Sequence, residues 1–449
     1  MRGLFALIAF VFSFSLTGCQ FVITIPNPVK IVWDAFDQPS GTEYIFQVHK
    51  DLENLFYDSN SLRPAKLFNG ALENMAEELK SKNMPFHFIK IEDTASIIKA
   101  KRQFTEEYKK AEALNAYIHN AVRLEFAALK GLLAAVDSSH TAFIAPERFK
   151  EIKRSNRGKS DYSGIGATVK KLEDNFYYMS LVIPDSPAAE AGIQKFDRLL
   201  KINGSVIPND VIQISKLLRG NENSSVEISL ERKGEVINFK AVRRVFALRP
   251  VSSHYLDRDN LKIVYVEFRD FNSDSVDELE KIIRLSQKDG VQGIILDLRG
   301  NRGGSVNSLK VVFKIFAIKE NAMVIRRHYD DQELKVSGKP LTNLPMVVLA
   351  DSDSASAAEI IAAVLQETKR ARVIGTKTAG AVEISRIVPL PLGPAMSVAI
   401  FQVFTPEGEI LEKIGVKPDE EILFSKKDIV AAQDIQLEAA LAAVEKLLK

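Results

Sequence analysis

Short apolar runs and amphipathic segments alternate along the second half of the chain. Three apolar runs bounded by turn residues predict buried strands: 263–268, 293–298 and 346–350. Apolar residues at helical spacing follow these runs and predict helices: 275–287, a segment from Ser305, and a segment that starts near 354–356. We therefore expect residues 261–425 to alternate strand and helix in an α/β layered core, with loops at the strand C-termini, where such folds place their sites.

The N-terminal part of the chain has a different pattern. From 43 to 148 the apolar residues fall mostly at helical spacing, and the pattern over 104–135 predicts one long amphipathic helix. His140 follows in a polar turn directly after that helix. The chain closes with another amphipathic segment near 427–448, which we expect to be a helix that packs against the rest of the fold.

Length and composition indicate a globular protein of two or three domains. The chain has 449 residues, of which 46% are hydrophobic, enough for sizeable cores. Its 60 basic and 58 acidic residues give a net charge of +2, so the charge balance indicates neither nucleic acid nor an acidic substrate.

The first residues have the pattern of a secretory signal. Arg2 precedes an apolar run over 4–16 that is too short to span a bilayer, and small residues follow up to Cys19. Cys19 is the single cysteine of the chain, so no internal disulfide can form. Its setting resembles a bacterial lipobox, which implies lipidation of Cys19 and stable anchoring by several acyl chains. The alternative is a cleaved signal whose cysteine is incidental.

Small hydroxyl residues begin the predicted helix at 354–356. Their oxygens suit the N-cap position, because they accept hydrogen bonds from the first unpaired backbone N–H groups. The same position suits a nucleophilic serine, since free N–H donors and the positive end of the helix dipole can stabilise an oxyanion. A plain capped helix is the alternative interpretation of this stretch taken alone.

A glycine-rich loop at 299–304 follows one of the predicted strands. It matches neither G-x-G-x-x-G nor a P-loop, so a nucleotide site has little support. Bare backbone N–H groups also form oxyanion holes. The six histidines are scattered with no H-E-x-x-H motif, and the G-x-S-x-G motif of α/β-hydrolases is absent from the sequence. We therefore expect no metal and no organic cofactor.

Residues 160–244 change to short strands and turns, with a helix near 211–218 and a last strand at 226–232. The order of these elements resembles a PDZ domain, which binds extended C-terminal peptides by strand addition beside a glycine-containing carboxylate loop. The resemblance implies that four residues form this loop: Ser163, Gly164, Ile165 and Gly166. Phe196 departs from the family, which usually has a glycine before the aspartate that follows.

Four motifs in order carry a second resemblance: 297–304, 354–360, 375–380 and 415–419. Together with the inserted PDZ segment, they resemble the C-terminal processing (tail-specific) serine peptidases and their tricorn-like relatives, over roughly the last two-thirds of the chain. The resemblance implies a multidomain α/β protein with a crotonase-like peptidase core. It identifies Ser356 as the nucleophile, and the backbone N–H groups of Ala357 and of Gly303 or Gly304 as the oxyanion hole.

The chain departs from these peptidases at the general base. The family usually places a catalytic lysine directly after the glycine of the Thr-x-Gly element, and that position is Ala381 here. Ser385 stands in place of a family glutamine, and Glu367 where a family aspartate usually lies. Lys377 lies four residues before Ala381, which makes it a poor substitute.

A different base is therefore needed, because an unassisted serine hydroxyl is a poor nucleophile near neutral pH. Tricorn-like members use a histidine before the PDZ-like insert, and Ser139-His140-Thr141 resembles that position. The resemblance implies His140 as the base, and Glu383 is our candidate for the orienting third group. Processing peptidases that use lysine also carry a histidine near this point. The alternatives are therefore a His140 that only shapes the groove, or an inactive site.

These inferences divide the chain into six segments: a lipoprotein signal peptide (1–18), a tether (19–42), an N-terminal helical region (43–158), a PDZ domain (159–245), the α/β serine peptidase core (246–426) and a C-terminal helix (427–449).

The main functional hypothesis is a lipid-anchored serine endopeptidase of the bacterial cell envelope, facing the periplasm. Its partners are the membrane and protein or peptide substrates with exposed C-terminal tails, and not nucleic acid. A PDZ-bearing pseudo-peptidase lipoprotein, which binds or scaffolds partners without cleaving them, is the alternative from another class. A crotonase-like acyl-CoA enzyme is a weaker alternative, because acyl-CoA is a cytoplasmic substrate and the signal predicts export.

Overall fold

The computed structural model describes residues 40–118, 123–155, 163–245, 250–316, 321–327, 330–335 and 339–449. The predicted signal peptide, Cys19 and most of the predicted tether lie outside these residues. Within the described ranges, no helix is long and apolar enough to cross a membrane.

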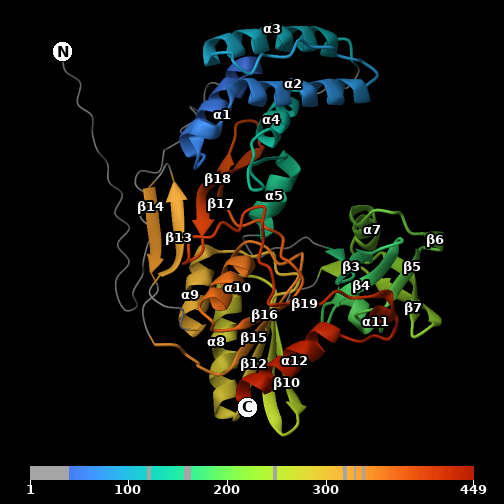
Figure 1. The fold of residues 1–449 in the computed structure, drawn as a ribbon. Helices are drawn as coiled ribbons and strands as arrows, with labels where there is room; N and C mark the ends of the chain where they lie inside the picture. Colours follow the sequence, from blue (N-terminus) through green and yellow to red (C-terminus); the bar gives the residue numbers. More distant parts are fainter. Residues whose placement is uncertain are drawn as a thin grey trace. The chain divides into compact units, whose positions relative to one another are not determined.

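Helices dominate the N-terminal region (Figure 1): α1 (Gly41–Leu55), η1 (Ser59–Ser61), α2 (Pro64–Ser81), α3 (Ile97–Asn115), α4 (Leu124–Ala134) and α5 (Pro146–Ser155). The prediction of one long helix over 104–135 is wrong, because α3 ends at Asn115 and α4 begins at Leu124. α4 crosses α2 so closely that a Cβ on Gly131 would lie 2.1 Å from the Gly70 carbonyl oxygen. This close crossing buries α4 on most of its sides. The polar face of one long amphipathic helix would not fit there.

A six-stranded sheet forms the centre of the C-terminal part. Its strands, in sheet order, are β10 (Val251–Arg258), β11 (Leu261–Phe268), β12 (Gly293–Asp297), β15 (Met346–Ala350), β16 (Arg372–Gly375) and β19 (Glu420–Glu421). β10 and β11 form an antiparallel hairpin, and the other neighbouring strands run parallel. The three predicted strands at 263–268, 293–298 and 346–350 are confirmed as β11, β12 and β15.

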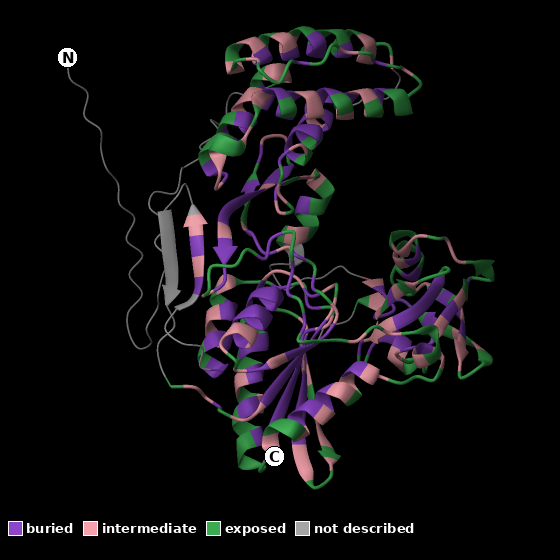
Figure 2. Ribbon diagram, viewed as in Figure 1, coloured by how far each residue is buried: buried purple, intermediate pink, exposed green. Residues whose placement is uncertain are grey.

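Helices cover both faces of this sheet. The predicted helices after β11, β12 and β15 are confirmed as α8 (Ser273–Lys288), α9 (Val306–Phe316) and α10 (Ala357–Glu367). α12 (Ile435–Leu448) packs on the face that carries Tyr265, Ile295 and Val347. Because side chains alternate along a strand, the residues between these point to the opposite face, toward the other helices. Every residue of β12 and β15 is buried, as expected of parallel strands covered on both sides (Figure 2).

The predicted closing helix is two helices. α11 (Lys426–Val430) precedes α12, and Ala432 between them has a φ of +54°, which a right-handed helix does not allow. Asp434 then caps α12 by accepting a hydrogen bond from the Leu437 N–H (3.1 Å).

A second sheet interrupts the predicted strand–helix alternation. It contains β1 (Ala142–Ile144), β18 (Ala395–Phe404), β13 (Asn321–Arg327) and β14 (Asp330–Lys335), with β17 (Ile384–Pro389) also paired to β18. The prediction of alternation throughout 261–425 is therefore wrong, since β13–β14 and β17–β18 are antiparallel hairpins. β18 is buried almost without interruption, so it lacks the period of two that marks a strand in sequence. Through β1, the segment that carries His140 joins this sheet.

The PDZ segment contains β3 (Ala167–Leu172), β4 (Phe176–Val182), β5 (Arg198–Ile202), β6 (Ser205–Val206), β7 (Ser225–Arg232) and β8 (Glu235–Val242), with helices α6 (Pro187–Glu190) and α7 (Val211–Leu218). β2 (Ser163–Gly164) and β9 (Arg244–Val245) form a separate pair. The prediction that the strand at 226–232 is the last is wrong, because β8 follows it. Lys233 and Gly234 make the hairpin turn with φ of +50° and +86°. Along β8, Ile237, Phe239 and Ala241 alternate with polar residues, and Phe239 and Ala241 pack in the core of the domain.

Candidate active site

Ser356 is the residue directly before helix α10. It is half-buried, with φ +56° and ψ −122°, a conformation that non-glycine residues adopt rarely and at a cost on the order of 1–3 kcal/mol. The Ser356 N–H donates to the Ala381 carbonyl oxygen (2.8 Å) and to Glu359 Oε2 (3.1 Å). The turn is therefore held in a strained conformation by its own backbone contacts, as turns at functional sites often are.

Glu359 ties the start of α10 to the loop that follows β16. Its carboxylate is fully buried and accepts hydrogen bonds from Thr378 Oγ1 (2.5 Å), the Gly380 N–H (2.6 Å) and the Ala381 N–H (2.8 Å). Because Ala381 also accepts from Ser356, one carboxylate fixes both sides of the turn. No role was assigned to Glu359 from the sequence, although its Ser-x-x-Glu spacing from Ser356 is that of a capping box.

The glycine-rich loop after β12 lies against the same turn. Gly303 has a φ of +88°, and a Cβ there would lie 2.6 Å from the Ser356 Cβ and 2.8 Å from the Ala357 nitrogen. Only glycine allows this approach. The Gly303 N–H donates to Asn301 Oδ1 (2.8 Å), so of the two predicted glycine donors Gly304 is the one whose N–H this side chain leaves free.

His140 lies half-buried in the turn between α4 and β1. Its Nδ1 is 2.9 Å from Ser139 Oγ, which donates to Glu412 Oε1 (2.7 Å), and 4.0 Å from Glu383 Oε2. Burial lowers the pKa of His140, and the negative charge of Glu412 partly opposes this shift. Across the described part of the chain, no hydrogen bond joins His140 to Ser356.

Two buried carboxylates lie beside the histidine. Burial raises the pKa of Glu383, which accepts a hydrogen bond from the Ser138 hydroxyl. Glu412 Oε2 accepts from the Val382 N–H (2.8 Å) and the Glu383 N–H (3.3 Å). His140, Glu383 and Glu412 each offer a ligand atom within 4.8 Å of the others, so a cation could bind there. Both oxygens of Glu412 already accept hydrogen bonds, from the Ser139 hydroxyl and from the Val382 N–H, so this carboxylate has partners without a cation.

From the sequence, Ser139 was named only as the neighbour of His140, and nothing pointed to Glu412. Ser139 adjoins His140, so a search for its hydrogen-bond partner would have found it. Glu412 is 273 residues from Ser139 and lies outside any patterned element, so no local signal marks it.

The methyl side chain of Ala381 cannot act as a base in place of the family lysine. Ala381 takes part in the site only through its backbone, which donates to Glu359 and accepts from Ser356. Lys377 is exposed, and among the described residues it makes no hydrogen bond or ion pair with Ser356. Lys413, which adjoins Glu412, pairs with Asp137.

The PDZ segment has an open strand beside the predicted carboxylate loop. Among the described residues, β3 is at one edge of its sheet and pairs only with β4, and α7 packs beside it. Of the predicted loop residues, Ser163 and Gly164 form β2, Ile165 is buried, and Gly166 has a φ of +78°. Phe196 also has a positive φ, +74°, so the turn has the backbone conformation that a glycine would adopt.

Comparisons with known proteins match both parts of the chain. The family described as peptidase family S41 matches residues 262–422, and the PDZ domain family matches residues 178–232. The carboxyl-terminal-processing protease of Picosynechococcus sp. is 30% identical over 300 residues, which cover 66% of this chain and 72% of that protein. The carboxy-terminal processing protease CtpB of Bacillus subtilis is 26% identical over 334 residues, 73% of this chain and 68% of that one.

Two solved structures share the fold. The photosystem II D1 C-terminal processing protease superposes with a TM-score of 0.57 at 21% identity, covering 86% of this chain and 93% of its own. The S41 protease structure from Bacteroides fragilis has a TM-score of 0.55 at 21% identity, covering 70% and 87%. The resemblance found in the sequence is confirmed: the chain belongs to peptidase family S41, with an inserted PDZ domain, among relatives named carboxyl-terminal-processing proteases.

Proposed function

We propose that this protein is a serine endopeptidase that cleaves through an acyl-enzyme on Ser356, with His140 as general base. The observation that carries the proposal is the strained Ser356 turn, packed at the start of α10 against Gly303. A serine placed in this way has backbone N–H groups beside its hydroxyl, which is what acyl transfer requires.

The reaction needs only groups of this chain and water. Ser356 Oγ attacks the scissile carbonyl carbon while its proton passes to His140 Nε2. The oxyanion is then stabilised by the N–H groups of Ala357 and of Gly304 or Gly303. Collapse of the tetrahedral intermediate breaks the C–N bond, and His140 returns the proton to the leaving amine. Water, deprotonated by the same histidine, then hydrolyses the ester and frees the serine.

The contacts of His140 support the tautomer that this mechanism needs. Ser139 Oγ donates its proton to Glu412, so it can only accept from His140 Nδ1. With the proton on Nδ1, Nε2 carries the lone pair of a base. Glu412, acting through Ser139, is therefore a better supported orienting group than Glu383, whose oxygen lies 4.0 Å from Nδ1.

Substrate capture would fall to the PDZ domain. The free edge of β3 suits an extended peptide that adds a strand, with its terminal carboxylate at residues 163–166. A pocket of about 320 Å³ beside Glu383 and Glu412, lined by Tyr57 and Val136 among others, offers room for a substrate side chain. With the lipobox at Cys19, the substrates would be proteins of the bacterial envelope, met at the periplasmic face of a membrane.

One observation favours a second candidate. His140 makes no hydrogen bond to Ser356 among the described residues, as expected of a PDZ-bearing pseudo-peptidase lipoprotein that binds tails without cleaving them. Catalytic hydrogen bonds are often long in enzymes without substrate, so the peptidase remains our proposal.

Labelling with a fluorophosphonate serine probe tests the proposal. We expect the wild type to be labelled and both Ser356→Ala and His140→Ala to lose labelling. Labelling lost only in Ser356→Ala would retain the peptidase and exclude His140 as its base. A folded wild type that binds tail peptides but takes up no probe would overturn the proposal in favour of the pseudo-peptidase. Amidated peptides serve as the control for recognition of the terminal carboxylate.

A further inference from the structure

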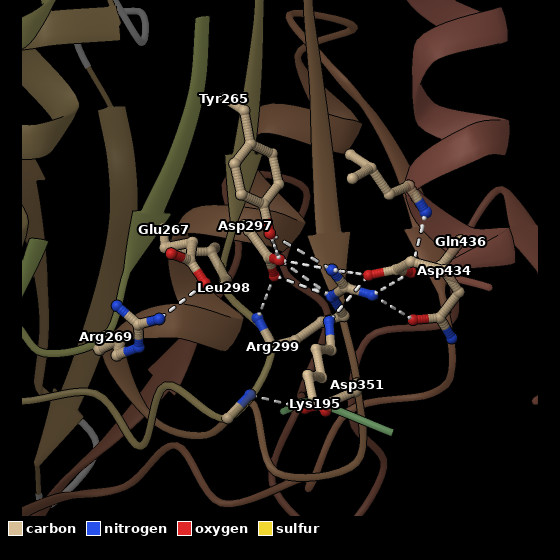
Figure 3. A network of polar contacts seen from close by, with 12 residues as sticks. Lys195, Tyr265, Glu267, Arg269, Asp297, Leu298, Arg299, Asp351, Asp434 and Gln436 are labelled. Atoms are coloured by element: carbon tan, nitrogen blue, oxygen red, sulfur yellow. Dashed lines mark hydrogen bonds and ion pairs between the residues drawn. The ribbon is translucent and has the colours of Figure 1, made fainter. Parts of the chain in front are cut away.

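The loop 299–304 is anchored at its first residue by a buried ion network (Figure 3). The Arg299 guanidinium bonds Asp297 at the end of β12 (2.6 Å from Nη2 to Oδ2) and Asp434 at the start of α12 (2.8 Å from Nη1 to Oδ1). It also reaches Gln436 Oε1 at 3.1 Å. A planar guanidinium bound on two sides by carboxylates fixes both the position and the orientation of the backbone that carries it.

The carboxylate of Asp434 is shared with the PDZ domain. Its Oδ2 accepts from Arg299 Nη2 (3.0 Å) and from Lys195 Nζ (2.8 Å) (Figure 3). Lys195 precedes Phe196, whose ring packs against Phe424 with ring centroids 5.4 Å apart. Burial alone would raise the pKa of Asp434, and the charges of Arg299 and Lys195 hold it below its ordinary value.

Gly300, the next residue of the loop, is also bound by a carboxylate that pairs with a lysine of the PDZ segment. The Gly300 N–H donates to Asp351 Oδ1 (2.9 Å), and Lys170 Nζ lies 2.5 Å from Asp351 Oδ2 and 2.7 Å from Asp353 Oδ2. Lys170 belongs to β3, an edge strand of the PDZ domain. Asp351 begins the turn that leads to Ser356, and its Oδ1 also accepts the Asp353 N–H (3.0 Å).

We propose that Lys195 and Lys170 are positioning residues of the peptidase site: through Asp434 and Asp351 they hold Arg299 and Gly300, and so set the place of the oxyanion donors in the loop. Two consecutive residues of one loop are each bound by a carboxylate, and each carboxylate takes a lysine from the PDZ segment. The PDZ domain would then be part of the framework of the catalytic site as well as a module for tails.

The kinetic part of this inference rests on the proposed function. A loop displaced by about 1 Å can cost on the order of 10²-fold in rate. Since neither lysine contacts Ser356 or His140 among the described residues, its loss should lower kcat and leave KM nearly unchanged. A purely structural role would change stability without this split between kcat and KM.

The test compares Lys195→Met, Lys170→Met and the double variant with Lys426→Met. The methionines keep most of the apolar stem and remove the charge. Lys426 is the matched control, because it also pairs with a PDZ residue, Asp174 (2.7 Å), but at an exposed place away from the loop. We expect kcat to fall about 10-fold in each single variant and further in the double variant, with KM within about two-fold, and Lys426→Met to match the wild type.

Amide hydrogen exchange of 299–304 gives a readout that needs no activity. We expect faster exchange there in the double variant and no change in Lys426→Met. Unchanged exchange, or a loss of kcat equally large in Lys426→Met, would overturn the inference. If the wild type took up no probe while exchange still rose in the double variant, the proposed function would fail and the anchoring of the loop by the two lysines would stand.

Discussion

The two halves of the candidate site are built in different ways. Around Ser356, backbone groups and one buried carboxylate, Glu359, hold a short stretch of chain in a strained conformation. Around His140, side chains from three distant segments meet, and the hydroxyl of Ser139 links the histidine to Glu412. The nucleophile is thus fixed by main-chain geometry, and the base by a chain of side-chain hydrogen bonds.

The two halves should therefore tolerate different substitutions. The Ser356 turn requires the absence of a Cβ at Gly303. The His140 cluster depends on charge and proton placement, which a single isosteric substitution changes. Four substitutions test this contrast.

Gly303→Ala should abolish most activity. The added Cβ would lie 2.6 Å from the Ser356 Cβ and 2.8 Å from the Ala357 nitrogen, so the turn and the oxyanion donors must move apart. We expect a loss of about 10³-fold in kcat/KM, in the range of losing an oxyanion donor. Gly300→Ala is the control, because Gly300 has a similar φ of +74° but no atom within 4 Å of an added Cβ. Equal losses in both variants would show that backbone strain, and not close approach, decides the effect.

Glu359→Gln should weaken both fold and activity. An amide keeps only one acceptor oxygen, so its NH₂ group must replace either Oε1, which accepts from Thr378 and Gly380, or Oε2, which accepts from Ala381 and Ser356. In either orientation two donors lose their acceptor. We expect about 3 kcal/mol less free energy of unfolding in urea and about 10²-fold lower kcat. Burial raises the pKa of Glu367, so its negative charge does not stabilise the folded state. Glu367→Gln, at the other end of α10, should therefore leave the free energy of unfolding nearly unchanged. A stable but inactive Glu359→Gln would show that Glu359 acts on the turn without supporting the fold.

Glu412→Gln should change the pH profile as well as the rate. The base must be neutral, so activity is lost as the pH falls through the pKa of His140, which burial places below its ordinary value of 6.5. Removing the Glu412 charge removes the influence that raises this pKa. The acid limb of kcat/KM should therefore move to lower pH, while the plateau falls about 10-fold as the link through Ser139 is lost. Glu409→Gln, an exposed carboxylate, is the control. A shift to higher pH would contradict the assignment.

Lys377→Met should have the smallest effect. The side chain is exposed, so we expect kcat/KM to stay within about two-fold of the wild type. A large loss in this variant, together with an active His140→Ala, would move the base from the histidine cluster to Lys377.

The sequence alone determined the strand–turn–helix unit around Ser356, the glycine loop and most PDZ elements. Each depends on local chemistry: an apolar strand, a helix start rich in small hydroxyl residues, and glycines where the chain approaches itself closely. The sequence did not reveal β18, because this buried strand is apolar almost throughout and has no period of two. The strand β8 was missed although Ile237, Phe239 and Ala241 alternate with polar residues.

Which side chains meet depends on the tertiary structure. Glu412 reaches Ser139 across 273 residues, and Asp434 reaches Arg299 across 135. Such contacts leave no periodic signal, because a single buried polar side chain is specified by the partner that the fold brings to it. The sequence could therefore place the nucleophile on its turn. It could not show which carboxylate orients the histidine, or that two lysines of the PDZ domain are bound into the framework of the glycine loop.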